Sequence, residues 1–204
     1  MTIRFHKGDL PADYAPGASI AVDTETLGLN PHRDRLCVVQ LSRGDGTADV
    51  VQIANGGARP AVLARLLDDP GVLKIFHFAR FDLAVLFHRL GVMPRPVYCT
   101  KIASRLTRTY TDRHGLKDLV RELLGIELSK QQQSSDWGAD TLSPDQLDYA
   151  ASDVLHLHAL KEKLDARLAR EGRGELAAAC FGFLPVRAQL DLQGWPDTDI
   201  FAHS

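Results

Sequence analysis

The sequence has few cysteines, no long apolar run and no strong excess of charge of either sign, and each absence excludes a class of protein. Its three cysteines, Cys37, Cys99 and Cys180, form no CxxC pair, so we expect free thiols in the core rather than a disulfide framework. Charges or glycines interrupt every apolar stretch before the roughly 18 residues that a membrane span requires. The first ten residues mix both signs of charge and hold no apolar segment, which predicts no secretory signal and favours the cytoplasm.

The net charge of the chain is also small. The formal net charge of −2, from 24 basic and 26 acidic residues, argues against a protein that coats long duplex DNA. The basic residues are unevenly placed, since the segment 80–121 holds nine Lys or Arg and three Asp or Glu. This local excess is explained either by solvated helix faces or by a cationic rim that faces a phosphate backbone. Both explanations suit a short or locally held nucleic acid better than a long one.

The hydrophobic pattern predicts one domain, 1–204, in which strands precede helices. Of the 204 residues 45% are hydrophobic and 25% charged, as in ordinary globular proteins. Apolar runs bounded by turn residues predict strands over 19–23, 35–42, 48–53, 72–77 and 97–99. Helical spacing predicts helices that begin at Pro60, cover 80–90, 100–106 and 116–124, run from Ser143 to about Arg170, and cover 174–192. We therefore expect a mixed α/β domain, with a mobile loop at the polar stretch 129–140.

The sharpest local feature is Asp23-Thr24-Glu25 at the end of an apolar strand. Alternation along a strand puts residues i and i+2 on one face, so Asp23 and Glu25 project together. Two adjacent carboxylates repel each other and are costly to bury unless a cation neutralises them. Oxygen ligands without a neighbouring His or Cys suit a hard cation, Mg²⁺ or Mn²⁺. Taken alone, this pattern is a weak indication of a metal site.

Two further carboxylates lie at helical positions. Asp82 follows Phe81 in the first turn of a helix, where an acidic residue also complements the helix dipole. Tyr149 and Asp153 are four residues apart on a helix and share a face, where a plain hydrogen bond would also explain them. Each motif alone favours a structural role. Their order along the chain, DxE, then FD, then YxxxD, favours a functional site.

This ordered set resembles the DEDD exonucleases of the tyrosine subclass. The segments 76–82, 130–137 and 142–153 are similar to the second and third exonuclease motifs of ribonuclease D, and the similarity covers about residues 19–165. The resemblance implies an α/β fold of the ribonuclease H-like (DnaQ-like) type, with a mixed central sheet flanked by helices. The length and the start DTETLGL look most like nano-ribonuclease C, a short member without the helical RNA-binding domains of ribonuclease D. Phe78 departs from the family, which commonly has Asn after the His of the second motif.

The resemblance also implies a chemistry. It implies a 3′→5′ exoribonuclease that clears short RNA oligonucleotides, down to dinucleotides, and releases nucleoside 5′-monophosphates. Two divalent cations would be held by Asp23, Glu25, Asp82 and Asp153, while Tyr149 would orient the attacking water or accept its proton. Such proteins assemble as homo-oligomers, for example an octameric ring. The apolar residues of the C-terminal helix (174–193) and tail supply the candidate surface, although capping the monomer's own core explains them equally well.

Substrate contacts and two alternative functions complete the expectations. Thr26 is assigned to the terminal sugar and Leu29 to an apolar wedge between two bases, although turn packing would also explain Leu29. His77 and Trp137 fit structural roles as well as substrate contacts. The alternatives are an exonuclease that acts on DNA or on longer structured RNA ends, and an inactive nucleic-acid-binding module, which should lack at least one of the four carboxylates. The full set of expected substrate contacts is Thr24, Thr26, Leu29, His77, Phe81, Gln133 and Trp137.

Overall fold

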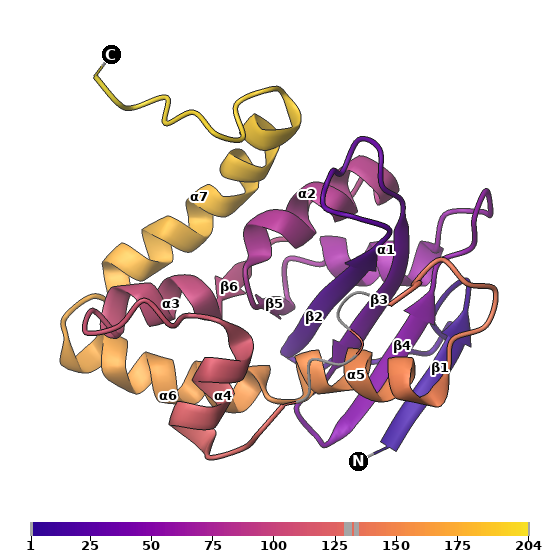
Figure 1. The fold of residues 1–204 in the computed structure, drawn as a ribbon, viewed down its shortest axis with the longest axis horizontal. Coiled ribbons are helices and arrows are strands. Elements are labelled where there is room, and N and C mark those ends of the chain that lie inside the picture. Colours follow the sequence, from indigo (N-terminus) through magenta and orange to yellow (C-terminus); the bar gives the residue numbers. More distant parts are fainter. Residues whose placement is uncertain (1, 129–131, 133–134, 204) are drawn as a thin grey trace.

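The computed structural model describes residues 2–128, 132 and 135–203, and shows a six-stranded sheet with helices on both faces (Figure 1). The strands are β1 (Thr2–Lys7), β2 (Ser19–Thr26), β3 (Leu36–Ser42), β4 (Thr47–Gln52), β5 (Leu73–Phe76) and β6 (Val97–Cys99). The helices are α1 (Ala61–Asp68), α2 (Ala79–Leu90), α3 (Thr100–Thr107), α4 (Leu116–Leu124), α5 (Pro144–Leu155), α6 (Leu157–Arg170) and α7 (Gly174–Leu192). The predicted α/β class is confirmed.

The sheet is mixed, in the order β1-β4-β3-β2-β5-β6. Strands β2, β3 and β4 form an antiparallel meander. In parallel, β1 pairs with β4, β5 pairs with β2, and β6 pairs with β5. The patterns did not predict β1. Its apolar residues Ile3 and Phe5 alternate with charged ones on an exposed edge, so the strand is held by pairing with β4 and not by a strong hydrophobic signal of its own.

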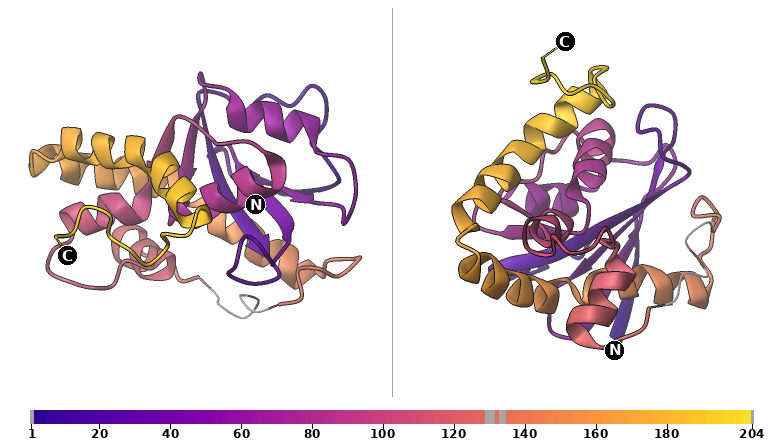
Figure 2. Two further views of the ribbon diagram at one scale, coloured as in Figure 1. Left: turned by 90° about the horizontal axis from the view of Figure 1, so that it is seen from above. Right: turned by 60° about the vertical axis from the view of Figure 1, so that its left-hand side comes forward.

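The alternation of β2 divides the core into two parts. Ile20 and Val22 pack with α1, α2 and the end of α7, whereas Ala21 packs with α4, α5 and α6. Figures 1 and 2 show α5 crossing β2, β3 and β4 on the side of the sheet to which Ala21 points. We call the two sides of the sheet the α2 face and the α5 face. Even-numbered residues of β2 therefore point to the α2 face and odd-numbered residues to the α5 face.

Local sequence signals fix several helix ends. Ser143 and Gln146 form a reciprocal capping box at the start of α5, with Pro144 as its first residue. Gly125 ends α4 with φ +70°, the left-handed conformation that favours glycine. Thr100 is the first residue of α3 and does not cap it. Cys99 precedes the helix, and the Thr100 hydroxyl donates to the Phe76 carbonyl at 3.2 Å, because the adjacent strand offers an acceptor inside the core.

The C-terminal helix α7 is anchored on α2. The Arg80 guanidinium donates to both carboxylate oxygens of Asp191, at 2.6 and 2.8 Å, and to the Pro196 carbonyl. This fork joins the first turn of α2 to the last turn of α7 and to the tail beyond it. None of the described helices is both long and apolar enough to cross a membrane.

Candidate active site

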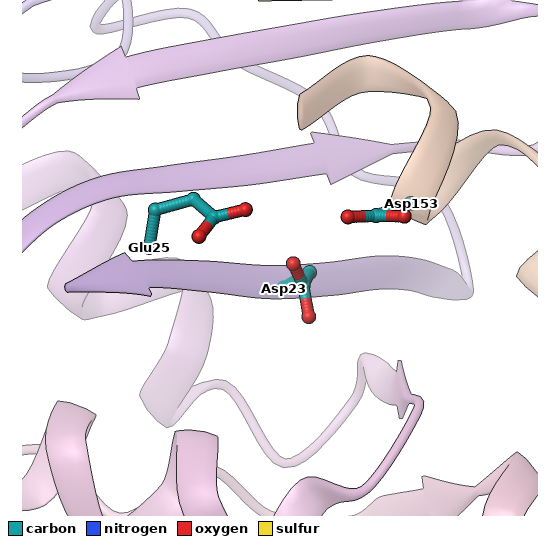
Figure 3. A group of neighbouring side chains, drawn as sticks. All are labelled: Asp23, Glu25 and Asp153. Carbon is teal, nitrogen blue, oxygen red and sulfur yellow. The ribbon is translucent and has the colours of Figure 1, made fainter. Parts of the chain in front are cut away.

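Three carboxylates converge on the α5 face of the sheet. Asp23, Glu25 and Asp153 each offer an oxygen, and these oxygens lie within 4.8 Å of one another (Figure 3). Asp23 and Glu25 project from β2 as alternation predicts, and Asp153 meets them from α5. The three line a cavity of about 560 Å³, together with Tyr149 and Leu29 among others. The sequence-predicted carboxylates are thus brought together, with the exception of Asp82.

The group carries strong electrostatic repulsion. Burial, followed by the charges of the neighbouring carboxylates, raises the pKa of Asp23 well above its ordinary value and that of Glu25 to about 9. Burial also raises the pKa of Asp153 to about 7. Within residues 2–128, 132 and 135–203, no Lys or Arg forms an ion pair with any of them. A divalent cation would relieve this repulsion, and the all-oxygen donor set fits Mg²⁺ or Mn²⁺.

Gln40 orients Asp23 from the neighbouring strand. It pairs directly with Asp23 across β2 and β3, is 0% exposed, and donates from Nε2 to Asp23 Oδ2 at 2.6 Å. Burial raises the pKa of Glu25, and a hydrogen bond from the Gln40 side chain to Glu25 partly opposes this rise. Sequence reasoning missed this residue. The available signal was an amide inside the apolar run 38–41, because a fully buried strand holds a polar side chain only when it has a partner.

Asp82 lies outside the group of three. It is 3% exposed on α2, and its carboxylate accepts a hydrogen bond from Thr24 Oγ1 at 2.7 Å. Burial raises its pKa to about 7, against the lowering effect of this bond. The charge of Asp82 raises the pKa of Asp23, so it is still close enough to act on the group. Thr24 faces α2 because it is an even-numbered residue of β2, and its substrate contact stays a prediction.

Tyr149 stands one helical turn before Asp153 on α5 and lines the same cavity. Burial and the charges of Asp153, Glu25 and Asp23 raise its pKa, so the phenol is protonated in the metal-free protein. Trp137 lies behind it, 2% exposed, with its ring centroid 6.0 Å from that of Tyr149. This burial fits the interpretation of Trp137 as a core anchor and leaves little of the ring exposed to a base.

The loop between β2 and β3 presents Leu29 to solvent. Leu29 is 85% exposed at the mouth of the cavity, which does not fit a turn-packing role. The loop itself is well tied, since Thr26 Oγ1 donates to the Gly28 carbonyl at 2.5 Å and Asn30 N donates to Asp34 at 2.9 Å. A Cβ at Gly28 would lie 2.3 Å from Asp34 Oδ2, so the close approach requires glycine. An apolar side chain held exposed by an ordered loop is available for contact with a ligand.

His77 and Phe81 lie around the same centre. His77 Nδ1 is 2.9 Å from Thr100 Oγ1, which fits the structural role, and burial lowers its pKa to about 3. The imidazole also lines a second cavity, of about 290 Å³, which contains Asp23, Tyr149 and Lys101. Phe81 shares the 560 Å³ cavity with Leu29. Gln133, predicted as a substrate contact, lies outside the described residues.

Phe78 has an unusual backbone for its residue type. Its φ of +67° and ψ of +43° place it in the left-handed region, and it is the one non-glycine residue with positive φ in the described chain. For a residue with a Cβ this conformation costs about 1–2 kcal/mol. The ring is 44% exposed, and Lys101 Nζ lies 4.3 Å from its centroid. The sequence marked Phe78 only as a departure from a common Asn, a residue that tolerates this conformation better.

Comparisons with known proteins identify relatives. The family profile described as 3′-5′ exonuclease matches residues 8–169. A solved structure described as the apo form of a nuclease is 66% identical, with a TM-score of 0.98 and both chains fully covered. Brucella melitensis NrnC is 63% identical in a structure with bound Mg²⁺ and 64% identical in one bound to pGG, each with a TM-score of 0.96 and full coverage of both chains.

A curated relative is longer. Ribonuclease D of Gluconacetobacter diazotrophicus is 38% identical over 160 residues, which cover 78% of this chain and 40% of that protein. The chain thus spans about two fifths of the length of the first curated relatives it matches.

Proposed function

This chain belongs to the 3′-5′ exonuclease family, and on that premise we propose that it is a metal-dependent exoribonuclease that degrades short RNA from the 3′ end. The observation that carries the proposal is the group of Asp23, Glu25 and Asp153 beside Tyr149, in a cavity with an exposed Leu29 at its mouth. The relatives support the same chemistry, since one is a ribonuclease D and another has been solved with Mg²⁺.

The carboxylates are suited to hold divalent cations. Asp23, Glu25 and Asp153 would hold them directly, Asp82 would complete the set, and two Mg²⁺ or Mn²⁺ ions per site are proposed from the family resemblance. When bound, such cations supply a water of lowered pKa and neutralise charge on the leaving oxygen. Gln40 would keep the Asp23 carboxylate aimed at them. Because burial has already raised the pKa of each carboxylate, cation binding must displace protons, and affinity should rise with pH.

Tyr149 is the proposed water-positioning residue. Its protonated phenol can accept a hydrogen bond from water through its oxygen while its own proton faces Asp153. Water would attack the phosphorus of the terminal phosphodiester, and the 3′ oxygen of the preceding nucleotide would leave. The phosphate then stays on the 5′ oxygen of the released nucleotide. The products would therefore be nucleoside 5′-monophosphates.

Short RNA is the proposed substrate class. The cavity of about 560 Å³ is of the size that encloses a small ligand. Leu29, which is 85% exposed, would insert between two bases of such a ligand. The relative bound to pGG, a 5′-phosphorylated dinucleotide, supports the same size class. RNA and DNA differ at the 2′-hydroxyl of the sugar, so the test includes a DNA arm.

The test measures hydrolysis of RNA and DNA oligonucleotides from two to about twenty nucleotides in Mg²⁺ or Mn²⁺. We expect kcat/KM to be highest for RNA dinucleotides, and equal values for long and short RNA would contradict the size preference. Asp153→Asn should abolish hydrolysis, since one of the three grouped carboxylates is lost. Asp148→Asn is the matched control, because Asp148 is an exposed acid of the same helix outside the group.

We also propose that the protein is a cytoplasmic homo-oligomer, for which an octameric ring is the expected form. The apolar C-terminal residues divide between the two roles foreseen for them. Leu184 is 5% exposed and Phe181 packs on Tyr98, so these cap the core. Trp195 and Phe201 are 42% and 76% exposed, so they are free for a second copy. Light scattering tests this, and a monomer at micromolar concentration would contradict it.

A further inference from the structure

Resting on the proposed function, we propose that Phe78 is a stacking platform for one nucleobase of the substrate and helps to set substrate affinity. The ring borders two cavities at once. One, of about 290 Å³, contains Asp23, Tyr149 and Asp153, and the other, of about 440 Å³, contains Leu29 and Phe81. No other side chain is common to the walls of these two cavities, among the residues that the structure describes.

The two faces of the Phe78 ring have different surroundings. Lys101 Nζ lies 4.3 Å from the ring centroid, and Lys101 lines the 290 Å³ cavity but not the 440 Å³ one. The ammonium group therefore covers one face of the ring on the side of the 290 Å³ cavity. Phe78 and Leu29 both line the 440 Å³ cavity. A planar base fits between an aromatic ring and an apolar side chain, and base–aromatic stacking tolerates any base identity.

The position of Phe78 leaves part of its ring available to a ligand. Phe78 is held in the left-handed conformation, and 44% of the residue stays exposed, so the ring still has apolar surface to offer. Asn would adopt the same backbone conformation with less strain. A strained and exposed aromatic ring at the edge of a catalytic cavity is explained if the ring gains its contacts when substrate binds.

Stability and substrate affinity should respond differently to one substitution of Phe78. In Phe78→Asn, relief of the backbone strain opposes the loss of the half-buried ring, so Tm should stay within about 4 °C of wild type. Loss of the ring should raise KM for the dinucleotide pGG between about 5-fold and 150-fold, with kcat changed by less than about twofold. Phe78→Tyr keeps a ring and should retain KM within about threefold. Phe87→Ala is the matched control, because Phe87 is a similarly exposed Phe on the same helix that borders neither cavity.

Two abasic analogues of pGG, each lacking one base, test the contact itself. On the analogue that lacks the stacked base, wild type and Phe78→Asn should have the same KM within about twofold, because the contact that the substitution removes is already absent. The other analogue should show the full effect of the substitution. A KM in Phe78→Asn within about twofold of wild type, or equal losses on both analogues, would overturn the platform alone. Wild-type protein that hydrolyses no oligoribonucleotide would overturn the proposed function as well.

Discussion

Replacement of Gln40 by Leu should weaken metal binding without weakening the fold. Gln40 is fully buried, and its Nε2 donates to Asp23 Oδ2 at 2.6 Å. A hydrogen bond to an ionised acceptor contributes about 1.5–3 kcal/mol, which corresponds to a factor of roughly 10 to 150 in an equilibrium constant. Leu has a similar volume and brings no polar group. Since the amide Oε1 has no partner within the described chain, its removal relieves the metal-free protein of one unsatisfied acceptor.

The assay is a titration of Mn²⁺ and Mg²⁺ by calorimetry at pH 7.5, combined with melting temperatures with and without metal. We expect the Kd of the variant for metal to rise about 10-fold to 150-fold. We expect the metal-free Tm to stay equal or to rise. Gln40→Glu is the opposite control, because a fourth acidic group at this position adds repulsion and should lower metal-free stability as pH rises. A Kd for Gln40→Leu within about twofold of wild type would refute the claim that this amide orients Asp23.

Three further predictions concern pH, the wedge residue Leu29 and the ion pair between the buried Arg108 and Glu122. Because the folded pKa values of Asp153 and Glu25, about 7 and about 9, exceed the unfolded ones, the metal-free protein should lose stability as pH rises from about 4 to 9. Melting curves should show added Mg²⁺ reversing this loss, and a pH-independent Tm would contradict it. Leu29→Ala should leave Tm unchanged and raise KM for pGG about tenfold, since the side chain is 85% exposed, and an unchanged KM would exclude the wedge. Glu122→Gln should lower the free energy of unfolding by about 1 kcal/mol at pH 7, measured by urea unfolding, because the fully buried Arg108 loses its charged partner. The effect is kept this small because Glu122 is itself 39% exposed. The Arg108 charge lowers the Glu122 pKa to about 2, so this contribution is present above pH 4.5 and disappears as pH falls toward 2, and equal stabilities of wild type and variant at pH 7 would contradict it.

Local periodicity was enough to predict most of the secondary structure, because the elements that build the core carry strong apolar patterns. The strand ending at Asp23 and Glu25 and the helix of Tyr149 and Asp153 are both of this kind. Strand alternation also predicted that Asp23 and Glu25 would point together. That Asp153 meets them could not follow from any local pattern, because it depends on how α5 lies across the sheet. The ordered resemblance supplied that link.

The residues that were missed depend on tertiary geometry. Gln40 acts on Asp23 through the β2–β3 register, which a sequence pattern does not specify to the residue. Phe78 was noted as an unusual residue, but its positive φ is a property of how β5 joins α2. Asp82 accepts a hydrogen bond from Thr24 outside the group of three, and its place among the metal ligands stays a prediction. Sequence reasoning gave the chemistry of the site more readily than the contacts that support it.

The alternation of β2 has a consequence for how such a protein can change over evolutionary time. Asp23 and Glu25 serve the α5 face, while Thr24, between them, serves α2 through Asp82. Insertion or deletion of one residue here would exchange the two sets, turning a carboxylate toward α2 and the threonine toward the cation site. Length changes in loops farther from the site carry no such penalty, because α2 and α5 deliver Asp82 and Asp153 as units. The spacing of Asp23 and Glu25 should therefore admit no insertion or deletion, whereas the separations along the sequence to Asp82 and Asp153 are free to change.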